Sequence, residues 1–558
     1  MSKTVLVVGG YGVFGGRLAL ALSKNENLEI VVAGRDGKKA EAFCRGTPCR
    51  PLCLDRNAHD IIETLKRISP FILIDAAGPF QKYGERAYSL AKAAMEAGAH
   101  YMDLSDDAEF TAGIIDLDER AKARKLVVLS GVSSVPALSS TVVSTLIAGM
   151  TDVHSIESAI LPGNRAPRGL SVIKAIISQV GNPLSIWRGG QYQQVPGWSG
   201  AKTFKVKDKS GKKVIKRVGS YIGAPDLRLF PQRYRARNVS FRAGLDLRIM
   251  HRGLWLLSLM VRGRLMQSLL PLAVPLKTIA QSLKHFGSKT GAMVVQVMGT
   301  TAQGTLVQKR WELIVKQGDG PSIPTIPAQI LVPKMIAEHV SFGARPCLEE
   351  FTLDEAELAL QSLCVETSTH EQALPLVFQS VLADDFESLL PIHQDLHTVL
   401  SYRRWTGRAA VQRGRNVLSK LAGAIAGFPK ANDDIDVQVE MKRTENGETW
   451  TRKFGAKRFR SYLSSKTRRD KVVLFERFGA MKFQIDLKLT DDGLHFPVTS
   501  GKVFGLPLPK MLLPISDAKE FVDEDGRARF HINVSLPICG HVATYSGWLK
   551  PADEIAPN

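Results

Sequence analysis

The chain of 558 residues contains few cysteines and no C-x-x-C pair. The six cysteines are Cys44, Cys49, Cys53, Cys347, Cys364 and Cys539. So few cysteines in a chain of this length exclude a dense disulfide framework and favour a reducing, cytoplasmic compartment. The spacing of Cys44, Cys49, Cys53 and His59 is irregular, so no metal site is expected. Glycines interrupt the apolar run after Lys3, which predicts a strand and a turn there rather than a secretory leader.

Long apolar segments are also missing. The most apolar segment, Gly253–Lys277, has its longest uncharged part at Leu265–Leu276, whereas a membrane-spanning helix needs about 20 apolar residues. Arg262 and Arg264 further exclude a span. We expect a buried helical pair or a contact between subunits, as in a homodimer, and the alternative that stays open is an interfacial helix on a membrane surface.

Three common catalytic motifs are absent: H-E-x-x-H, G-x-S-x-G and G-x-x-x-x-G-K-[ST]. The chain is therefore not expected to be a metalloprotease, a hydrolase or a nucleotide triphosphatase of those types.

Acidic residues are scarce in two segments of this chain, whose net charge is +20. Residues 201–264 carry 17 Lys and Arg against 3 Asp, and residues 401–471 carry 18 against 7 acidic residues. This excess predicts an anionic partner, either a phosphate ligand or an anionic membrane surface, with two merely solvated faces as the alternative. Nucleic acid ranks last because no recognition motif accompanies the charge.

Short apolar runs alternate with helical patterns over residues 1–145. The runs are Val5–Val8, Ile30–Ala33, Pro51–Leu54, Phe71–Ile74, Tyr101–Leu104 and Leu126–Leu129. Strand and helix in regular alternation predict an α/β fold, a Rossmann-type doubly wound parallel sheet.

Two further domains are expected. Residues 146–370 contain runs typical of strands, "SVIKAIIS", "KTFKVKD", "GAMVVQVMG" and "KRWELIVKQ", which predict a mixed α/β domain with an extended sheet whose last helices return to the first domain. Residues 371–558 show alternating strands with Asn-Gly and Asp-Gly turns at Asn446, Asp492 and Asp525. This pattern predicts an antiparallel β-rich domain.

A G-x-G-x-x-G motif follows the first predicted strand and opens a helix. Its residues are Gly10, Tyr11, Gly12, Val13, Phe14 and Gly15. The glycines permit the tight turn, the approach of a pyrophosphate and close helix packing, while the helix amino terminus offers free N–H groups to the phosphates. The strand–turn–helix context predicts dinucleotide binding.

The end of the second strand distinguishes NADP from NAD. The strand ends in Gly34 and Arg35, and a guanidinium there can stack on adenine and bind a 2′-phosphate through two hydrogen bonds. NADP is therefore the expected cofactor. Asp36 is the argument against this, because a shift of one residue would place a carboxylate at the ribose.

Several segments, in order, resemble saccharopine-dehydrogenase-like oxidoreductases. They are "VLVVGGYGVFGGRLA", "VVAGRDGKKAE", "IDAAGPFQKYGERAYSLAKAAMEAGAHYMDLS", "GVSSVPALSS" and "GARPCLEEFTLDE". The resemblance covers roughly residues 1–370 and implies an NADP-binding domain. The remainder, with "FERFG", "GLPLPKMLLP" and "YSGWL", is similar to an uncharacterised domain often fused to such proteins, which names no activity.

The resemblance also implies which loops face the cofactor. The loop of Ala77, Gly78, Pro79 and Phe80 follows the fourth strand and would pass beside the nicotinamide ribose. Asp103 ends the fifth strand at the same edge and would face the substrate, with capping of the next helix as an equal alternative. Asp103 and Tyr83 are the candidate catalytic residues. Tyr88 and Lys92 match the Tyr-x-x-x-Lys pair of short-chain dehydrogenases but lie on a different helix, so an amphipathic surface explains them.

The expected function is an NADP(H)-dependent oxidoreductase that transfers hydride to a C=N, C=C or C=O bond. The basic, aliphatic middle segment favours a lipid-like or acyl small molecule over the imine of saccharopine chemistry. The alternative is a non-catalytic NADP-binding module that docks on an anionic membrane or a partner protein.

Overall fold

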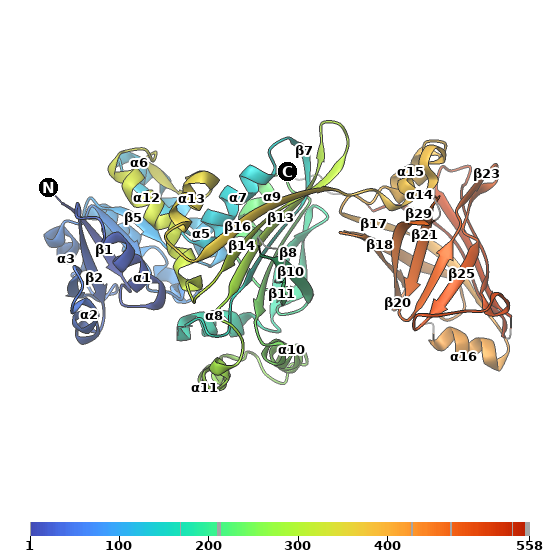
Figure 1. The fold of residues 1–558 in the computed structure, drawn as a ribbon, viewed down its shortest axis with the longest axis horizontal. Helices are drawn as coiled ribbons and strands as arrows, with labels where there is room; N and C mark the ends of the chain where they lie inside the picture. Colours follow the sequence, from blue (N-terminus) through green and yellow to red (C-terminus); the bar gives the residue numbers. More distant parts are fainter. Residues whose placement is uncertain are drawn as a thin grey trace. The chain divides into compact units, whose positions relative to one another are not determined.

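The computed structural model describes residues 2–167, 169–208, 214–425, 428–468, 471–537 and 539–552 (Figure 1). Three lysines of the first basic segment, Lys209, Lys212 and Lys213, lie outside the described residues. The chain forms two compact units. The first contains residues 1–187, 192–297 and 309–371, and the second contains residues 188–191, 298–308 and 372–558. The domain boundaries expected near residues 145 and 370 stay predictions.

The first sheet is parallel throughout, in the order β15-β6-β5-β4-β1-β2-β3. Its strands are β1 (Lys3–Val8), β2 (Leu28–Gly34), β3 (Arg50–Cys53), β4 (Ile72–Asp75), β5 (His100–Asp103), β6 (Val127–Ser130) and β15 (Gly343–Pro346). The helices that connect them are α1 (Val13–Leu22), α2 (Gly37–Cys44), α3 (Ile61–Ile68), α4 (Ser89–Glu96), α5 (Ala108–Gly113), α6 (Asp118–Ala123) and α7 (Ser139–Leu146). This architecture confirms the expected doubly wound sheet.

Alternate residues of each central strand enter two different cores, because side chains in a strand point to opposite faces. Val5 and Val7 pack in one core with Leu18 of α1, whereas Leu6 packs in the other with Leu90 of α4. Helices therefore cover both faces. The strand order turns back between β4 and β1, which opens a crevice at the carboxyl ends of the strands, where ligands of such folds bind.

The second sheet is mixed, in the order β10-β11-β12-β7-β13-β14-β16, with a β8–β9 hairpin attached to β12. Its strands are β7 (Met150–Leu161), β8 (Pro183–Arg188), β9 (Gln191–Pro196), β10 (Lys202–Lys207), β11 (Val214–Tyr221), β12 (Asn238–Leu245), β13 (Gly291–Thr301), β14 (Leu306–Val315) and β16 (Val365–Ala373). The associated helices are α8 (Leu170–Gln179), α9 (Asp226–Arg233), α10 (Arg248–Arg262), α11 (Ala273–Ser282), α12 (Ile326–Ile336) and α13 (Leu353–Leu360).

Two expectations for this region are wrong. The run "SVIKAIIS" forms helix α8, not a strand, because its apolar residues recur at positions i, i+1, i+4 and i+5 and so lie on one helical face. The segment Gly253–Lys277 does not form a buried helical pair. Large side chains of α10 and α11 are exposed, among them Leu256 and Val274.

The third sheet is antiparallel and belongs to the second unit, in the order β23-β24-β27-β28-β29-β17-β18-β19-β20-β21-β22-β25-β26. Its strands are β17 (Tyr402–Arg413), β18 (Asn432–Thr444), β19 (Gly447–Phe454), β20 (Lys457–Arg468), β21 (Lys471–Phe478), β22 (Met481–Ile485), β23 (Lys488–Thr490), β24 (Gly493–His495), β25 (Val498–Val503), β26 (Leu506–Pro507), β27 (Ile515–Val522), β28 (Ala528–Leu536) and β29 (Gly540–Pro551). The helices are α14 (Val377–Leu382), α15 (Pro391–His397) and α16 (Val417–Ile425). The predicted turns at Asn446, Asp492 and Asp525 each join two adjacent strands.

None of the helices in the described ranges is both long enough and apolar enough to cross a bilayer.

Candidate active site

The turn between β1 and α1 is built from glycines because backbone fills the space around it. A Cβ on Gly10 would lie 2.7 Å from the carbonyl oxygen of Val7, and a Cβ on Gly15 would lie 2.4 Å from that of Gly9. Gly9 itself has a φ of +77°, a conformation that glycine adopts without strain. The sequence pattern pointed to Gly10, Gly12 and Gly15 and missed Gly9.

The amino terminus of α1 fits a pyrophosphate. Gly12 is the N-cap residue, and it contributes no side chain to the first turn. Within the described residues, no acceptor is found for the amides of Val13, Phe14 and Gly15, and the helix ladder begins with the Gly16 amide donating to Gly12 at 2.9 Å. These free N–H groups and the positive end of the helix dipole favour an anion there.

The Tyr11 side chain packs on the end of β2. Its ring occupies the space that a Cβ of Gly34 would need, with ring atom Cε1 2.4 Å from that position. Its hydroxyl accepts a hydrogen bond from the Asp36 amide at 3.2 Å. Gly34 therefore allows the glycine turn and the end of β2 to lie against each other.

Arg35 and Asp36 differ in the contacts that their side chains make. The strand ends at Gly34, and Asp36 caps α2 by accepting a hydrogen bond from the Lys39 amide at 3.1 Å. Its carboxylate also pairs with the Lys39 ammonium at 3.0 Å, and these contacts lower the pKa of Asp36. The exposed guanidinium of Arg35 forms no ion pair among the residues described. Asp36 is thus engaged in the helix cap, whereas Arg35 is available to a ligand.

The loop after β4 lies directly beside the glycine turn. The Ala76 carbonyl oxygen and the Ala77 Cα are each 2.8 Å from the position that a Cβ of Gly9 would occupy. The Ala77 amide donates to Asp75 Oδ1 at 2.9 Å, which fixes the start of the loop. The structure therefore brings together the glycine turn and the Ala77–Phe80 loop, 60 or so residues apart in the sequence.

Phe80 and Tyr83 belong to a buried aromatic cluster. The ring of Phe80 is buried and lies 5.1 Å from Tyr83 and 5.1 Å from Phe110. Tyr83 donates a hydrogen bond to Asp75 Oδ2 at 3.0 Å, and the Arg56 guanidinium lies 3.4 Å from the centre of its ring. Burial and the Asp75 carboxylate raise the pKa of Tyr83, so its phenol stays protonated.

Asp103 ends β5 and is paired in register with Asp75 of β4. Its Oδ1 accepts three hydrogen bonds, from the Ser105 amide at 3.0 Å, the Ser130 hydroxyl at 2.9 Å and the Gly131 amide at 2.9 Å. Its Oδ2 is buried without a hydrogen-bond partner among the described residues. Burial raises the pKa of Asp103 to about 7, despite these hydrogen bonds.

The alternative role of Asp103 as a helix cap is wrong. Asp107 caps α5, because its carboxylate accepts a hydrogen bond from the Phe110 amide at 2.8 Å. Tyr88, part of the Tyr-x-x-x-Lys match, donates its hydroxyl to the Phe110 carbonyl at 2.7 Å, so a backbone contact accounts for its phenol.

Sequence comparison finds a family that resembles the first domain. Residues 5–129 match the family model described as "Saccharopine dehydrogenase NADP binding domain". The matched region is similar to that family and contains the glycine turn, the Ala77–Phe80 loop and Asp103. The match supports a nicotinamide dinucleotide as the cofactor and an oxidoreductase as the class of protein. Residues 389–549 match a "Domain of unknown function (DUF4166)".

Solved structures match the chain only at low identity and low TM-score. Saccharopine dehydrogenase (L-Glu forming) from Saccharomyces cerevisiae is 13% identical with a TM-score of 0.46, over 66% of this chain and 100% of that one. Biliverdin reductase from Synechocystis is 10% identical with a TM-score of 0.30, over 64% of this chain and 96% of that one. No curated protein sequence matches the chain at a significant level.

Two residues of the NADP-binding domain were missed by sequence reasoning. Asp75 and Arg56 complete the cluster around Tyr83, and Arg56 Nη1 is buried without a hydrogen-bond partner in the described part of the chain. Asp75 could have been found from its position, because it ends β4 one residue before the "AAGPF" loop, as Asp103 ends β5. Arg56 follows the edge strand β3 in an irregular segment that carries no comparable signal.

The second unit has a buried polar cluster of its own on the inner face of its sheet. His397 Nε2 lies 2.7 Å from Glu520 Oε2, and the His397 ring stacks on Phe378 at 3.8 Å. Trp450 donates its indole N–H to Glu448 Oε2 at 2.9 Å. Trp450 and Phe454 of β19 are both buried.

Proposed function

We propose that the protein is an NADP(H)-dependent oxidoreductase whose active site lies at the carboxyl ends of β1, β4 and β5. When bound, the nicotinamide supplies a hydride to a C=N, C=C or C=O carbon. The observation that carries the proposal is the uncapped amino terminus of α1. The amides of Val13, Phe14 and Gly15 have no acceptor among the described residues, and the Ala77 loop lies beside the same glycine turn.

The residues present fit the cofactor in two places. Gly10, Gly12 and Gly15 permit the tight turn, because side chains there would meet its backbone, and this turn precedes the helix amides that would bind the pyrophosphate. Arg35 would hold the 2′-phosphate through its guanidinium, since Asp36 is committed to capping α2. The second feature, Arg35, supports NADP over NAD.

Asp103 is the proposed proton donor. A carboxyl group with a pKa of about 7 is protonated in a large fraction of molecules at neutral pH and can give up that proton readily. Among the described residues, its Oδ2 has no hydrogen-bond partner, while Oδ1 accepts hydrogen bonds from Ser105, Ser130 and Gly131. In reduction, the Asp103 proton would go to the nitrogen, oxygen or carbon next to the atom that receives hydride.

Tyr83 is proposed as a positioning residue rather than a second acid. Its hydroxyl proton is directed to Asp75, and its high pKa opposes proton release. Through Asp75 it would fix the Ala77 amide and hence the loop beside the nicotinamide.

Calorimetric titration of the full chain with NADPH and with NADH tests the cofactor assignment. We expect tighter binding of NADPH, and absence of heat with both nucleotides would contradict the proposal. NADPH oxidation in a small-molecule metabolite extract then tests turnover. Binding without turnover in any extract would favour the alternative of a non-catalytic NADP-binding module.

A further inference from the structure

Helices α10 and α11 expose the side chains that amphipathic helices usually bury. The inward face of α10 carries His251, Ser258 and Val261. His251 Nε2 lies 2.9 Å from the Ser220 hydroxyl, and Trp198 donates to the His251 carbonyl at 3.1 Å. Leu254 and Leu257 also pack partly buried against the core, whereas other large apolar residues of the helix are exposed.

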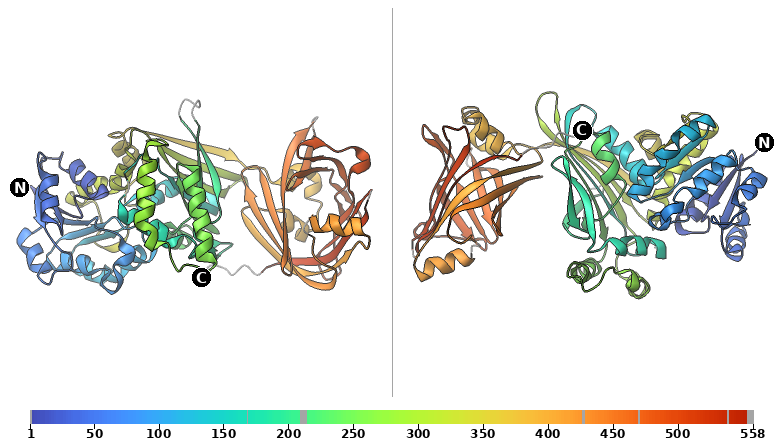
Figure 2. Two further views of the ribbon diagram at one scale, coloured as in Figure 1. Left: turned by 90° about the horizontal axis from the view of Figure 1, so that it is seen from below. Right: turned by 180° about the vertical axis from the view of Figure 1, so that it is seen from behind.

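The exposed apolar residues form one surface, which we call the α10–α11 face. They come from α10, α11 and the segments that follow each helix. Their exposed fractions are 73% for Ile249, 42% for Trp255, 58% for Leu256, 77% for Leu265, 61% for Val274, 53% for Ile279 and 64% for Phe286. Figure 2, left, shows the two helices side by side, coloured green.

The charge on this face has a single sign. Residues 247–311 contain no Asp or Glu. The cations around the two helices are Arg248, Arg252, Arg262, Arg264, Lys277, Lys284 and Lys289. Within the described residues, none of these seven forms an ion pair with a carboxylate. Exposed aliphatic and aromatic side chains bordered by unpaired cations are the arrangement by which interfacial helices bind anionic lipid surfaces.

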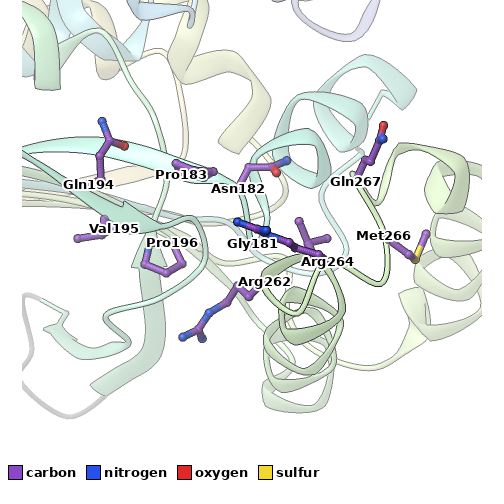
Figure 3. A pocket seen from close by; sticks show the side chains of 11 residues that line it. Gly181, Asn182, Pro183, Gln194, Val195, Pro196, Arg262, Arg264, Met266 and Gln267 are labelled. Carbon is purple, nitrogen blue, oxygen red and sulfur yellow. The ribbon is translucent and has the colours of Figure 1, made fainter. Parts of the chain in front are cut away.

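A pocket of about 770 Å³ lies at the carboxyl end of α10. Arg262 and Arg264 line it together with Asn182 and Gln194 of the β8–β9 region (Figure 3). Gly181, at a φ of +82°, allows α10 to pack closely against it, because a Cβ at Gly181 would lie 2.7 Å from the Val261 Cβ. Two guanidiniums and two amides provide hydrogen-bond donors for a phosphodiester headgroup.

A second copy of this chain fits the face less well than a membrane does. A two-fold dimer places the same patch on both sides of the interface, so each set of seven cations would meet itself with no carboxylate to compensate. An anionic bilayer supplies the opposite charge and an apolar layer together.

We propose that the α10–α11 face docks the protein on an anionic lipid bilayer. The face adjoins the proposed active site, since α11 packs on α8, and Gly169 before α8 would place a Cβ 3.9 Å from the Val13 side chain. Docking would therefore bring the substrate crevice close to the bilayer. The proposal rests on the proposed function only for that consequence, not for binding itself.

Co-sedimentation of the full chain with phosphatidylglycerol-containing vesicles tests the docking. We expect binding at low salt, a steep loss at high salt, and little binding to phosphatidylcholine alone. Leu256→Glu should abolish binding. Arg248→Glu with Arg252→Glu should weaken it by about fivefold for each cation. Glu is favoured at Arg248 in the first turn of the helix and is a good helix former at Arg252, so the double variant should keep α10 folded.

Matched controls separate the face from general effects of charge. Leu358→Glu changes an equally exposed leucine of α13, and Lys66→Glu with Arg67→Glu reverses two exposed cations of α3. These variants should bind vesicles like the natural protein. All variants should bind NADPH normally, so a failure of docking is distinguishable from a failure of the cofactor assignment.

Three results would overturn the docking proposal. One is no binding to anionic vesicles at low salt, and the second is equal loss of binding in the control variants. The third is a stable dimer that Leu256→Glu dissociates, which would show that a second copy covers the face.

Discussion

The molecule buries carboxyl groups in two sheets, but at different places in each. In the parallel sheet, Asp75 and Asp103 end adjacent strands and lie at the edge where loops begin. In the antiparallel sheet, Glu448 and Glu520 lie within strands on the inner face, with Trp450 and His397 as their partners. Asp75 and Asp103 lie near backbone amides that have no acceptor among the described residues. Glu448 and Glu520 form hydrogen bonds with the side chains around them.

This difference distinguishes a ligand-binding site in the first sheet from a structural core in the antiparallel sheet. Strand ends and helix starts leave backbone groups unpaired, so a ligand can complete them. Within antiparallel strands, every backbone group is paired, and buried polar side chains must find each other. We therefore expect changes in the first sheet to affect ligand binding and turnover, and changes in the second to affect stability.

Gly12→Asp should have the largest effect on ligand binding at the first sheet, so it tests this contrast most strongly. The new Cβ would lie 3.0 Å from the Gly9 carbonyl oxygen, and the carboxylate would stand where the pyrophosphate is expected. We expect NADPH affinity to fall by about a hundredfold or more, the cost of an uncompensated charge. Calorimetry measures this, with Ala123→Asp on the exposed side of α6 as control. Unchanged affinity would show that the turn does not hold the cofactor.

Arg35→Asp tests whether the first sheet distinguishes NADPH from NADH. Loss of a charged hydrogen-bond donor to the 2′-phosphate should weaken NADPH binding by about tenfold to a hundredfold, and NADH binding should hold or improve. Arg67→Asp on α3 serves as control. Fluorescence titration with both nucleotides gives the ratio, and an equal loss for both would remove the role of Arg35.

Asp103→Asn and Glu448→Gln compare the two sheets directly. Burial raises the pKa of each carboxyl to about 7, so the folded protein holds these protons more tightly than the unfolded chain. Stability therefore falls as the pH rises from about 4 to about 7. Each variant removes a titrating group and should reduce this slope by about 1.4 kcal/mol per pH unit.

Hydrogen exchange at several pH values resolves the two units separately, because each unit has its own protected amides. Asp103→Asn should flatten the pH dependence in the first unit and also lower NADPH oxidation, since Asn cannot donate the proton. Glu448→Gln should act in the second unit and leave NADPH binding unchanged. Full activity of Asp103→Asn would contradict its role as proton donor.

Glu520→Gln should have the smallest effect and the opposite sign. Burial acts to raise the pKa of Glu520, but the charge and hydrogen bond of His397 outweigh it and lower that pKa. The stability from Glu520 is therefore present above its unfolded pKa and lost as the pH falls through its folded pKa. We expect a loss of about 1–2 kcal/mol at neutral pH that disappears in acid. Denaturant unfolding of the second unit measures it, and a loss that grows in acid would refute the pairing.

Local patterns predicted much of the first sheet and its glycine turn. Val5–Val8 and the G-x-G-x-x-G motif act through residues next to each other in sequence, so their geometry could be derived without the rest of the chain. The run "SVIKAIIS" was misjudged because β-branched residues favour strands, while their spacing fits a helix equally well. Helix packing decided between the two.

The sequence by itself determined the dinucleotide turn, the alternation that makes a parallel sheet and the β-rich second unit, because each depends on short-range periodicity and on glycine. Only the tertiary structure decided that Asp75 lies beside Asp103 and that Asp36 caps a helix while Arg35 does not. It also decided that α10 exposes Leu256 and Leu259. These features depend on contacts between segments that are far apart in the sequence. The burial and pairing of polar side chains arise only from such contacts.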